Sequence, residues 1–384
     1  MIINNLKNSK VENLEIIERK GIGHPDTLAD GIAEELSRQF CNLSLEKYGR
    51  FLRYFFDKVI IYGGISEVEF GKGFMKEPFK VLVPAMVSSI NDIDTLIKEK
   101  TIDYLKSVLH EFSEEFCKVI PIVYKTKTKF YEHEKASDTS IGSGYYPFSG
   151  TEKITLDVEK FLNSQGYKKN KPFLGEDIKV LAFRNKQKIE LTLACSFISK
   201  YIFDKEDYFE KKKTVEENIK EFINKNYSKK INLDINPDDK EKVYLSFLGS
   251  CIDSFAVGIS GKGNKVNGIT SLFRSASQEA VFGKNIIRHP GKIYNILSFI
   301  IAKRFVECFN LKECYVHLLG KVGNEIKIPD KVVIEPLGKL NKNEALKEYS
   351  HIMDNLDTLR KFLLKQNICK NPESIFCIFW TYRI

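Results

Sequence analysis

The sequence predicts an α/β fold, in which buried strands and amphipathic helices alternate along the chain. The strand pattern is clearest over residues 59–62, an apolar run that stops at two glycines. The helix pattern is clearest over residues 28–49, where apolar residues recur at helical spacing and Gly49 can end the helix. With 384 residues, 43% of them hydrophobic, the chain is long enough for two or three domains or one elaborate one.

The remaining elements follow from the same two patterns. Helices are predicted over residues 97–112, 151–162, 211–227 and 293–305. Strands are predicted over residues 51–62, 80–87, 119–124, 190–199, 231–235 and 243–248, with another that opens at 175–180. Residues 125–129 alternate lysine with threonine, which indicates a solvated edge strand or loop, and the glycine-rich residues 137–147 are predicted as a loop. No element is predicted from Pro372 onward.

Charge and cysteine usage bear on the class of partner. The net charge of +9 comes mainly from dispersed lysines, and no C2H2, RRM or helix-turn-helix pattern stands out. We therefore expect no nucleic-acid partner, since an anionic small substrate fits the charge equally well. The eight cysteines form no Cys-x-x-Cys pair, so a zinc site is not expected. Without an apolar secretion signal or a run of membrane-spanning length, we expect a cytoplasmic protein with no membrane partner.

Residues 18–27 read Glu-Arg-Lys-Gly-Ile-Gly-His-Pro-Asp-Thr, and a helix is expected to start near Pro25. A helix N-terminus preceded by glycines offers free backbone N–H groups to an anion. Asp26 fits a phosphate site if a divalent cation lies between its carboxylate and the phosphates. A tight turn with a structural histidine explains the same spacing, so spacing alone leaves both interpretations open. The positive side chains expected to favour phosphate are Arg19, Lys20 and His24.

Three later segments also combine charged side chains with features that suit ligand binding. Residues 137–147 contain one carboxylate, Asp138, among glycines and hydroxyl groups. Asp177 and Lys179 lie two apart in a strand and therefore on one face, where an ordinary ion pair is an alternative to ligand binding. In residues 262–268, glycines let the backbone approach a ligand, and Lys262 and Lys265 supply positive charge.

Residues 18–34 closely resemble the corresponding segment of the archaeal-type S-adenosylmethionine synthetases (methionine adenosyltransferases). Four further segments resemble family motifs in the family's order: 137–147, Glu-Asp-Ile-Lys-Val at 176–180, Gly-Lys-Gly-Asn-Lys-Val-Asn-Gly at 261–268, and Gly-Lys-Asn with His-Pro-Gly-Lys-Ile-Tyr-Asn within 283–295. In the segment at 261–268, lysines replace two arginines of the family. The resemblance covers most of the chain, from Glu18 to Tyr315, and is weaker beyond it.

The resemblance implies a fold of three similar α/β subdomains, interleaved along the chain around a pseudo-threefold axis. Residues 1–384 would then form a single unit. The resemblance also implies a homodimer in which two subunits pack sheet to sheet and the active sites lie between them. The alternation of helices and strands agrees with this fold but does not reveal the threefold repeat.

The family's reaction forms S-adenosylmethionine: the methionine sulfur attacks C5′ of ATP and expels the triphosphate, which is then hydrolysed. A neutral thioether needs no general base, so cations aimed at the leaving triphosphate supply most of the catalysis. The resemblance implies ATP as substrate and Mg²⁺ as cofactor, and leaves K⁺ open as a second ion. By resemblance, the catalytic residues are His24, Lys179 and Asp138, the ATP and phosphate ligands are Asp177, Lys262, Lys265, Lys284, His289 and Lys292, and the metal ligand is Asp26.

The chain departs from the family pattern where the amino acid and the sulfonium would bind. Residues 255–258 read Phe-Ala-Val-Gly where the family has Gly-Asp-Asp-Gly, so Ala256 and Val257 replace two carboxylates. Residues 55–58 read Phe-Phe-Asp-Lys in place of Asn-Thr-Asp-Gln, and Ile65 replaces a polar residue. We therefore expect retained triphosphate binding and an altered second-substrate site.

A divergent methionine adenosyltransferase is the first hypothesis. The alternatives are a related enzyme that uses another nucleophile at C5′ or only cleaves triphosphate, a non-catalytic subunit that pairs with a competent synthetase, and, most distantly, a basic nucleic-acid-binding protein. The presence of His24, Asp26, Asp177 and Lys179 argues against a non-catalytic subunit. The missing Asp-Asp pair argues against the first hypothesis in its plainest form.

Overall fold

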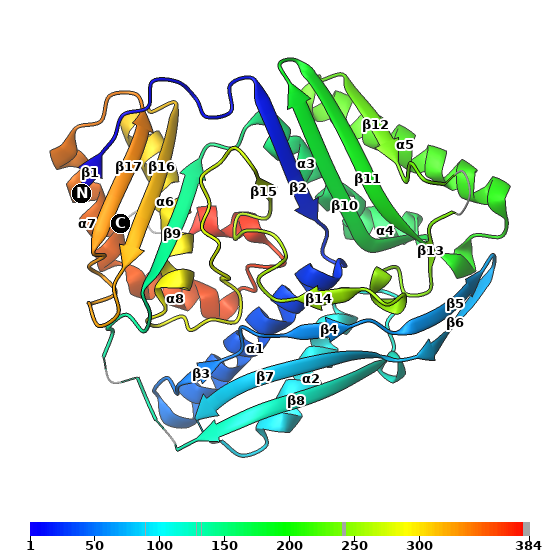
Figure 1. Cartoon of the computed structure of the whole chain (residues 1–384), viewed down its shortest axis with the longest axis horizontal. Coiled ribbons are helices and arrows are strands. Elements are labelled where there is room, and N and C mark those ends of the chain that lie inside the picture. The colour runs from blue at the N-terminus through cyan, green and yellow to red at the C-terminus, as the bar shows by residue number, and fades with distance from the viewer. Residues whose placement is uncertain (89, 128, 132, 240–242, 379–384) are drawn as a thin grey trace.

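The structure is a computed structural model that describes residues 1–384 except 89, 128, 132, 240–242 and 379–384. Three β-sheets lie around a common centre, and each is covered by helices on one side (Figure 1). Each sheet combines strands from distant parts of the chain, so the three α/β units are interleaved, as the resemblance implied. Within the described residues, no helix is both long enough and apolar enough to cross a membrane.

The first sheet carries the segment that leads into the His24 loop. Antiparallel pairing of two of its strands, β10 (Leu174–Asn185) and β2 (Leu14–Lys20), places Lys179 opposite Lys20. Helices α3 (Gly150–Leu162) and α5 (Lys205–Tyr227) pack on this sheet, and α4 (Gln165–Asn170) lies beside α3. The strand order is β12 (Ile231–Ile235), β11 (Lys188–Ile198), β10 (Leu174–Asn185), β2 (Leu14–Lys20) and β15 (Thr270–Ser271), with β13 (Leu245–Ser246) paired to β11.

The second sheet supports the helix that follows the His24 loop, α1 (Pro25–Tyr48). That helix has Pro25 in its first turn and ends at Gly49, whose φ of 63° is the predicted left-handed cap. Helix α2 (Ile93–Lys106) packs beside it. The strand order is β14 (Val257–Ile259), β4 (Ile60–Tyr62), β7 (Phe79–Ser88) and β3 (Tyr54–Phe55), with β8 (Cys117–Thr126) parallel to β7 and a separate hairpin of β5 (Ile65–Glu69) and β6 (Lys72–Glu77).

The third sheet contains the first and the last strand of the described chain, β1 (Ile2–Ile3) and β17 (Lys331–Leu337), which pair with each other. Helix α6 (Pro290–Phe309) packs directly on it, α7 (Lys342–Asp354) packs on α6, and α8 (Leu356–Lys365) packs on α1. The strand order is β1 (Ile2–Ile3), β17 (Lys331–Leu337), β16 (Glu313–Gly320) and β9 (Ser140–Tyr146). Short 3₁₀ helices lie at Glu114–Phe116, Ser199–Tyr201, Cys251–Asp253 and Pro372–Cys377.

The prediction that residues 137–147 form a loop is wrong for Ser140–Tyr146, which form the largely buried strand β9. A Cβ at Gly142 would lie 2.2 Å from the carbonyl carbon of Tyr294. A Cβ at Gly144 would lie 2.4 Å from the amide nitrogen of Phe299. The two glycines therefore let α6 lie directly on the strand, rather than marking a loop.

Several predicted boundaries move for local reasons. The strand expected at 51–62 is two short strands, because the Phe56 and Val59 amides bond outside the ladder, to Gly283 and Ser260. Helices α2 and α5 both begin before their predicted starts. The strand expected at 243–248 is reduced to β13, and residue 128 of the segment 125–129 lies outside the described residues.

The helices leave the opposite face of each sheet uncovered (Figure 1). The apolar cores lie between helices and sheets, one cluster under the first sheet and another under the second and third. Exposed apolar side chains remain on strands of all three sheets: Tyr62, Ile122, Tyr124, Val257, Ile259, Leu181, Phe183 and Ile141.

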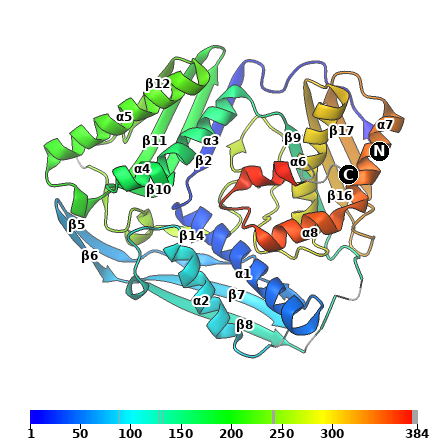
Figure 2. The ribbon, with the colours of Figure 1, turned by 180° about the vertical axis from the view of Figure 1, so that it is seen from behind.

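Residues 367–378 lie between the three units (Figure 2). Asn367 donates to the Gly31 carbonyl of α1 at 3.0 Å, and Glu373 pairs with Lys160 of α3. The ring of Phe376 packs against rings from the third unit and its neighbouring turn: Tyr146, Phe148 and Phe299. The segment therefore joins helices and turns from all three units.

Candidate active site

Residues 21–24 connect β2 to α1 and pack tightly against β10. The amides of Gly21 and Gly23 donate to carbonyl oxygens of β10 at 2.8 and 3.1 Å. The Ile22 amide donates to the carboxylate of Glu159 at 3.2 Å. The amides of these three loop residues are therefore not free to bind an anion. The glycines serve packing, because a Cβ at Gly23 would lie 2.6 Å from the Glu176 side chain.

The side chain of Arg19 is also bound to groups of the protein itself. It is almost fully buried, pairs with Glu159 at 2.9 Å and donates to the Gly268 carbonyl at 2.7 Å. These contacts tie the end of β2 to α3 and to the loop at 262–268. Arg19 therefore does not offer its charge to a phosphate, contrary to expectation.

His24 caps the N-terminus of α1, where its Nδ1 accepts the Asp26 amide at 3.2 Å. An accepting ring nitrogen carries no proton, and burial lowers the pKa of His24 below its ordinary value despite the nearby carboxylates of Asp177 and Asp26. The ring is therefore neutral near pH 7 and has a hydrogen only on Nε2. The expectation that His24 supplies positive charge is wrong; it supplies an N–H donor.

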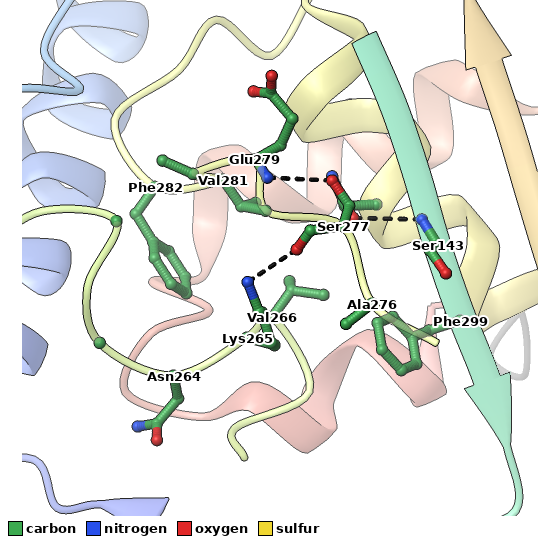
Figure 3. Close-up of a pocket in the computed structure, with 14 residues that line it drawn as sticks. Ser143, Asn264, Lys265, Val266, Ala276, Ser277, Glu279, Val281, Phe282 and Phe299 are labelled. Atoms are coloured by element: carbon green, nitrogen blue, oxygen red, sulfur yellow. Dashed lines mark hydrogen bonds between the residues drawn. The ribbon is translucent and has the colours of Figure 1, made fainter. Parts of the chain in front are cut away.

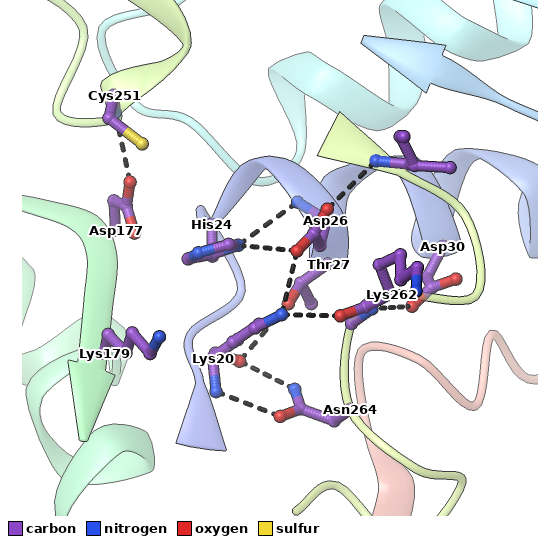
Figure 4. A network of polar contacts seen from close by, with 12 residues as sticks. Lys20, His24, Asp26, Thr27, Asp30, Asp177, Lys179, Cys251, Lys262 and Asn264 are labelled. Carbon is purple, nitrogen blue, oxygen red and sulfur yellow. Dashed lines mark hydrogen bonds and ion pairs between the residues drawn. The ribbon is translucent and has the colours of Figure 1, made fainter. Parts of the chain in front are cut away.

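Asp26 lies at the centre of a polar network in the first turn of α1 (Figure 4). Its Oδ2 accepts Lys20 Nζ at 2.8 Å, and its Oδ1 accepts the Ile259 amide at 3.0 Å. Lys20 also donates to the Lys262 carbonyl at 2.6 Å. Among the described residues no cluster of three or more metal-binding side chains occurs. A single carboxylate with spare lone pairs still fits a magnesium ion that is held mainly by phosphate oxygens.

β10 brings Asp177 and Lys179 beside this network (Figure 4). Asp177 is buried and accepts the Cys251 amide at 3.1 Å, and burial raises its pKa. Lys179 is 38% exposed and pairs with Glu18 at 2.8 Å instead of with Asp177. Because partly exposed ion pairs are weak, Lys179 is able to exchange Glu18 for a more highly charged ligand.

A second group of candidates surrounds the N-terminus of α6. His289 caps this helix by accepting the Gly291 amide at 3.1 Å, and burial together with Lys284 lowers its pKa to about 4. The His289 ring is therefore also neutral near pH 7, and its Nε2 lies 3.8 Å from Asp138. Lys284 is buried and pairs with Glu279 at 2.5 Å.

A narrow cavity lies beside the loop at 261–266, with Lys265 in its lining (Figure 3). Lys265 Nζ donates to the Ser277 carbonyl at 2.7 Å, and burial lowers the pKa of Lys265. Only a small part of the space in this cavity is wide enough for a water molecule. The cavity is too narrow in this conformation to hold a nucleotide.

Lys292 has a different environment from the other candidates. It is fully buried in α6, and its ammonium group pairs with Glu34 of α1 at 2.5 Å. Glu34 also accepts the Gly283 amide at 3.0 Å. These contacts hold α6 and the preceding segment to α1.

The ten candidates thus separate into two groups and two isolated lysines. Within the described residues, no hydrogen bond or ion pair joins a member of the first group to a member of the second. Lys265 and Lys292 likewise have no hydrogen bond or ion pair with either group among the described residues; their partners are Ser277 and Glu34. The first group is His24, Asp26, Asp177, Lys179 and Lys262; the second is Asp138, Lys284 and His289.

Sequence reasoning missed several residues that build the first group. Asn264 exchanges two hydrogen bonds with the Lys20 backbone, at 2.9 and 2.7 Å. Asp30 of α1 accepts amides of the loop at 261–263. The helical spacing of Asp26, Asp30 and Glu34 was the available signal, since it places three carboxylates on one face of α1.

Comparisons with known proteins show the family of this chain. Residues 1–367 match the profile of the family described as S-adenosylmethionine synthetase (AdoMet synthetase). The S-adenosylmethionine synthase of Pyrococcus furiosus is 33% identical over 383 residues, covering 94% of this chain and 96% of the relative. That of Methanocaldococcus jannaschii is 35% identical over 349 residues, covering 84% and 85%.

The fold comparison gives the same result. The structure titled "Structure of an Unusual S-adenosylmethionine synthetase from Campylobacter jejuni" superposes with a TM-score of 0.61 over 94% of both chains. Its sequence identity is 16%, so this likeness concerns the fold alone. With a family profile that matches nearly the whole chain and relatives that exceed 30% identity, the chain belongs to the S-adenosylmethionine synthetase family.

Proposed function

We propose that the protein is a methionine adenosyltransferase, which converts methionine and ATP to S-adenosylmethionine, phosphate and diphosphate. The methionine sulfur attacks C5′ of ATP, the bond from C5′ to the triphosphate oxygen breaks, and the triphosphate is then hydrolysed. The curated relatives are named S-adenosylmethionine synthases and match nearly the whole chain. At the level of the site, the convergence of His24, Asp177 and Lys179 at the start of α1 carries the proposal.

The lysines near the loop at 262–268 fit the leaving group. Negative charge grows on the triphosphate as it leaves, so cations fixed near it lower the barrier. Lys262 and Lys265 have no carboxylate partner among the described residues, and Lys179 has the partly exposed Glu18. We assign these three lysines to the phosphates, and we assign the paired Lys284 a secondary role there.

His24 acts in this proposal as a neutral donor. Its Nδ1 is held by the Asp26 amide, which fixes the ring and leaves Nε2–H for the oxygen that departs from C5′. His289, whose ring is held in the same manner, would orient Asp138. Asp138 is more than half exposed, and its carboxylate would stabilise the cationic sulfonium of the product.

Asp26 would hold Mg²⁺ together with phosphate oxygens of ATP. Bound there, the ion would neutralise part of the phosphate charge. Asp26 would exchange its contact with Lys20 for the ion, while its other oxygen keeps the Ile259 amide. We assign no residue to K⁺.

We infer that the active enzyme is a homodimer with its sites between the subunits. The exposed apolar side chains on the uncovered sheet faces support this, because burial against a second copy would remove them from water. The separation of the candidates into two groups also supports it, since the first group of one subunit would complete a site with the second group of the other. Residues 1–384 would act as a single unit, and the eight free cysteines favour a reducing, cytoplasmic location.

The proposal is tested by incubating the protein with ATP and Mg²⁺, with and without methionine, and identifying the products by mass spectrometry. We expect S-adenosylmethionine when methionine is present, from a particle near twice 44.3 kDa by light scattering. Release of triphosphate or phosphate that does not depend on methionine would favour triphosphate cleavage as the activity. Absence of both ATP binding and turnover would favour a non-catalytic subunit.

A further inference from the structure

Three carboxylates lie one helical turn apart on α1, and the middle one, Asp30, has an unusual set of partners. Asp26 contacts Lys20, and Glu34 pairs with Lys292. Within the described part of the chain, Asp30 has no ion-pair partner. Its Oδ1 instead accepts the Gly261 amide at 2.6 Å, and its Oδ2 accepts the Gly263 amide at 3.1 Å.

The burial of Asp30 without a cation makes its ionised form unfavourable. The residue is 1% exposed, and burial raises its pKa to about 8, although the two amides act in the opposite direction. Burying a carboxyl group without a cation is unfavourable, and hydrogen bonds from two backbone amides offset only part of that cost. An apolar residue at this point of α1 would avoid the cost but would leave the two loop amides without an acceptor.

We propose that Asp30 is a positioning residue that fixes the loop at 261–263 for phosphate binding. The two amides that it accepts flank Lys262, one on each side. Asp26 accepts the amide of Ile259 one helical turn earlier, so α1 takes the amides of alternate loop residues in sequence. Lys262, and the chain that continues to Lys265, therefore start from a backbone clamped to α1. The inference rests on the proposed function, because it assumes that these lysines bind the triphosphate.

Gly263 supports the same conclusion. A Cβ at this position would lie 2.2 Å from Asp30 Oδ2 and 3.4 Å from the Asp26 carbonyl oxygen. The sequence suggested that this glycine lets the backbone approach a ligand. In the structure it lets the backbone approach the Asp30 carboxyl group, so Asp30 and Gly263 form one contact that either substitution disrupts.

The test compares Asp30→Asn and Gly263→Ala with the wild-type protein in calorimetric titrations with tripolyphosphate and Mg²⁺. Asparagine keeps one oxygen acceptor but turns an NH₂ group toward an amide N–H, so one loop amide loses its partner. We expect tripolyphosphate to bind roughly tenfold or more weakly to each variant, the loss typical of leaving one buried hydrogen-bond donor without its partner. The KM for methionine should stay within about twofold, because the loop amides do not face the amino acid in this proposal.

A matched control is Asp239→Asn, which also changes a buried acidic side chain with two polar partners, Tyr208 and Lys212, both on α5 of the first unit. It should lower the melting temperature without weakening tripolyphosphate binding. If Asp30 and Gly263 act through one contact, the double variant should bind about as weakly as either single variant.

Two outcomes would overturn the proposal. Tripolyphosphate binding at wild-type strength by folded Asp30→Asn would do so, and if that variant fails to fold, wild-type binding by folded Gly263→Ala would do so. Absence of tripolyphosphate binding by the wild-type protein would instead overturn the proposed function, and the positioning role with it.

Discussion

His24 and His289 cap two different helices in the same way. In each case Nδ1 accepts the amide two residues further on, at 3.2 Å in α1 and 3.1 Å in α6, and proline occupies the first helical turn. The same cap in two of the three units agrees with a fold built from repeated parts. Each cap also fixes a neutral ring with its Nε2–H turned away from the helix, which is a donor rather than a cation.

Replacing Lys179 with alanine should lower turnover by roughly a hundredfold or more, a typical loss for one preorganised charge in the transition state. Stability should change by less than about 1 kcal/mol, because the Lys179–Glu18 pair is partly exposed. Steady-state kinetics and thermal unfolding measure the two effects. A matched control is Lys188→Ala, which breaks an exposed Lys–Glu pair at 2.7 Å on the neighbouring strand β11 and should leave turnover unchanged. Wild-type turnover in folded Lys179→Ala would remove Lys179 from the site.

Asp26→Asn should raise the magnesium concentration needed for ATP binding. Asparagine keeps an oxygen for the Ile259 amide, so the loop stays attached while the negative charge that would attract Mg²⁺ is lost. Titration of ATP at several fixed magnesium concentrations gives the dependence. An unchanged dependence would mean that Asp26 serves only the helix N-terminus and its two hydrogen-bonding partners.

The double substitution Ala256→Asp with Val257→Asp should improve the use of methionine. In the single subunit Val257 is 48% exposed and Ala256 is half-buried, so the fold of the subunit does not itself bury a carboxylate at either position. The wild-type protein lacks these charges for the methionine ammonium group, so its methionine KM should exceed roughly 1 mM, the upper end usual for enzymes. The same changes should leave the KM for ATP within about threefold. A low methionine KM in the wild-type protein, unchanged in the double variant, would show that other groups bind the ammonium.

His289 should make the folding stability sensitive to acid. An unfolded histidine binds a proton near pH 6.5, whereas burial lowers the pKa of folded His289 to about 4. Between these values the unfolded state binds more protons, so stability is present above pH 6.5 and is lost as the pH falls toward 4. The loss should reach about 1 kcal/mol at pH 5.5, relative to pH 7.5.

The comparison variant for this effect is His289→Asn, because asparagine caps a helix but does not titrate. Urea unfolding at pH 7.5 and pH 5.5 gives the free energy of unfolding for both proteins. The variant should lose about 1 kcal/mol less than the wild-type protein on acidification. Equal losses would mean that His289 is not held neutral in the folded protein.

Ile375→Ala should destabilise the protein by about 2–5 kcal/mol, the range for removing a fully buried branched side chain. Ile375 is fully buried in the segment 367–378, where the three units meet (Figure 2). The neighbouring exposed Cys377 provides the control, since Cys377→Ala should change stability by less than about 0.5 kcal/mol. Urea unfolding measures both, and equal stability of the two variants would show that this segment does not hold the units together.

Local pattern determined much of the fold. Helix α1, with proline at its start and Gly49 at its end, follows from apolar spacing and from two residues with strong backbone preferences. Strand β12 matches its predicted bounds, residues 231–235, because a short run between polar segments has few alternatives. The family motifs likewise identified the residues His24, Asp177 and Lys179, which the tertiary structure brings together.

Tertiary contacts decided the rest. Gly142 and Gly144 suggested a loop, yet they lie in a buried strand. Helix α6 packs so closely on this strand that a Cβ at either position would clash with the helix backbone. The amides of Gly21 and Gly23 donate to β10, and Arg19 and the Ile22 amide donate to Glu159. These partners lie more than 130 residues away, so no local pattern reveals them. Whether a charged side chain is free or paired depends on such distant partners. For that reason the sequence alone could name Lys262 and Lys292 as equals. Only the fold separates Lys262, a loop lysine with no ion-pair partner among the described residues, from Lys292, which is buried against Glu34.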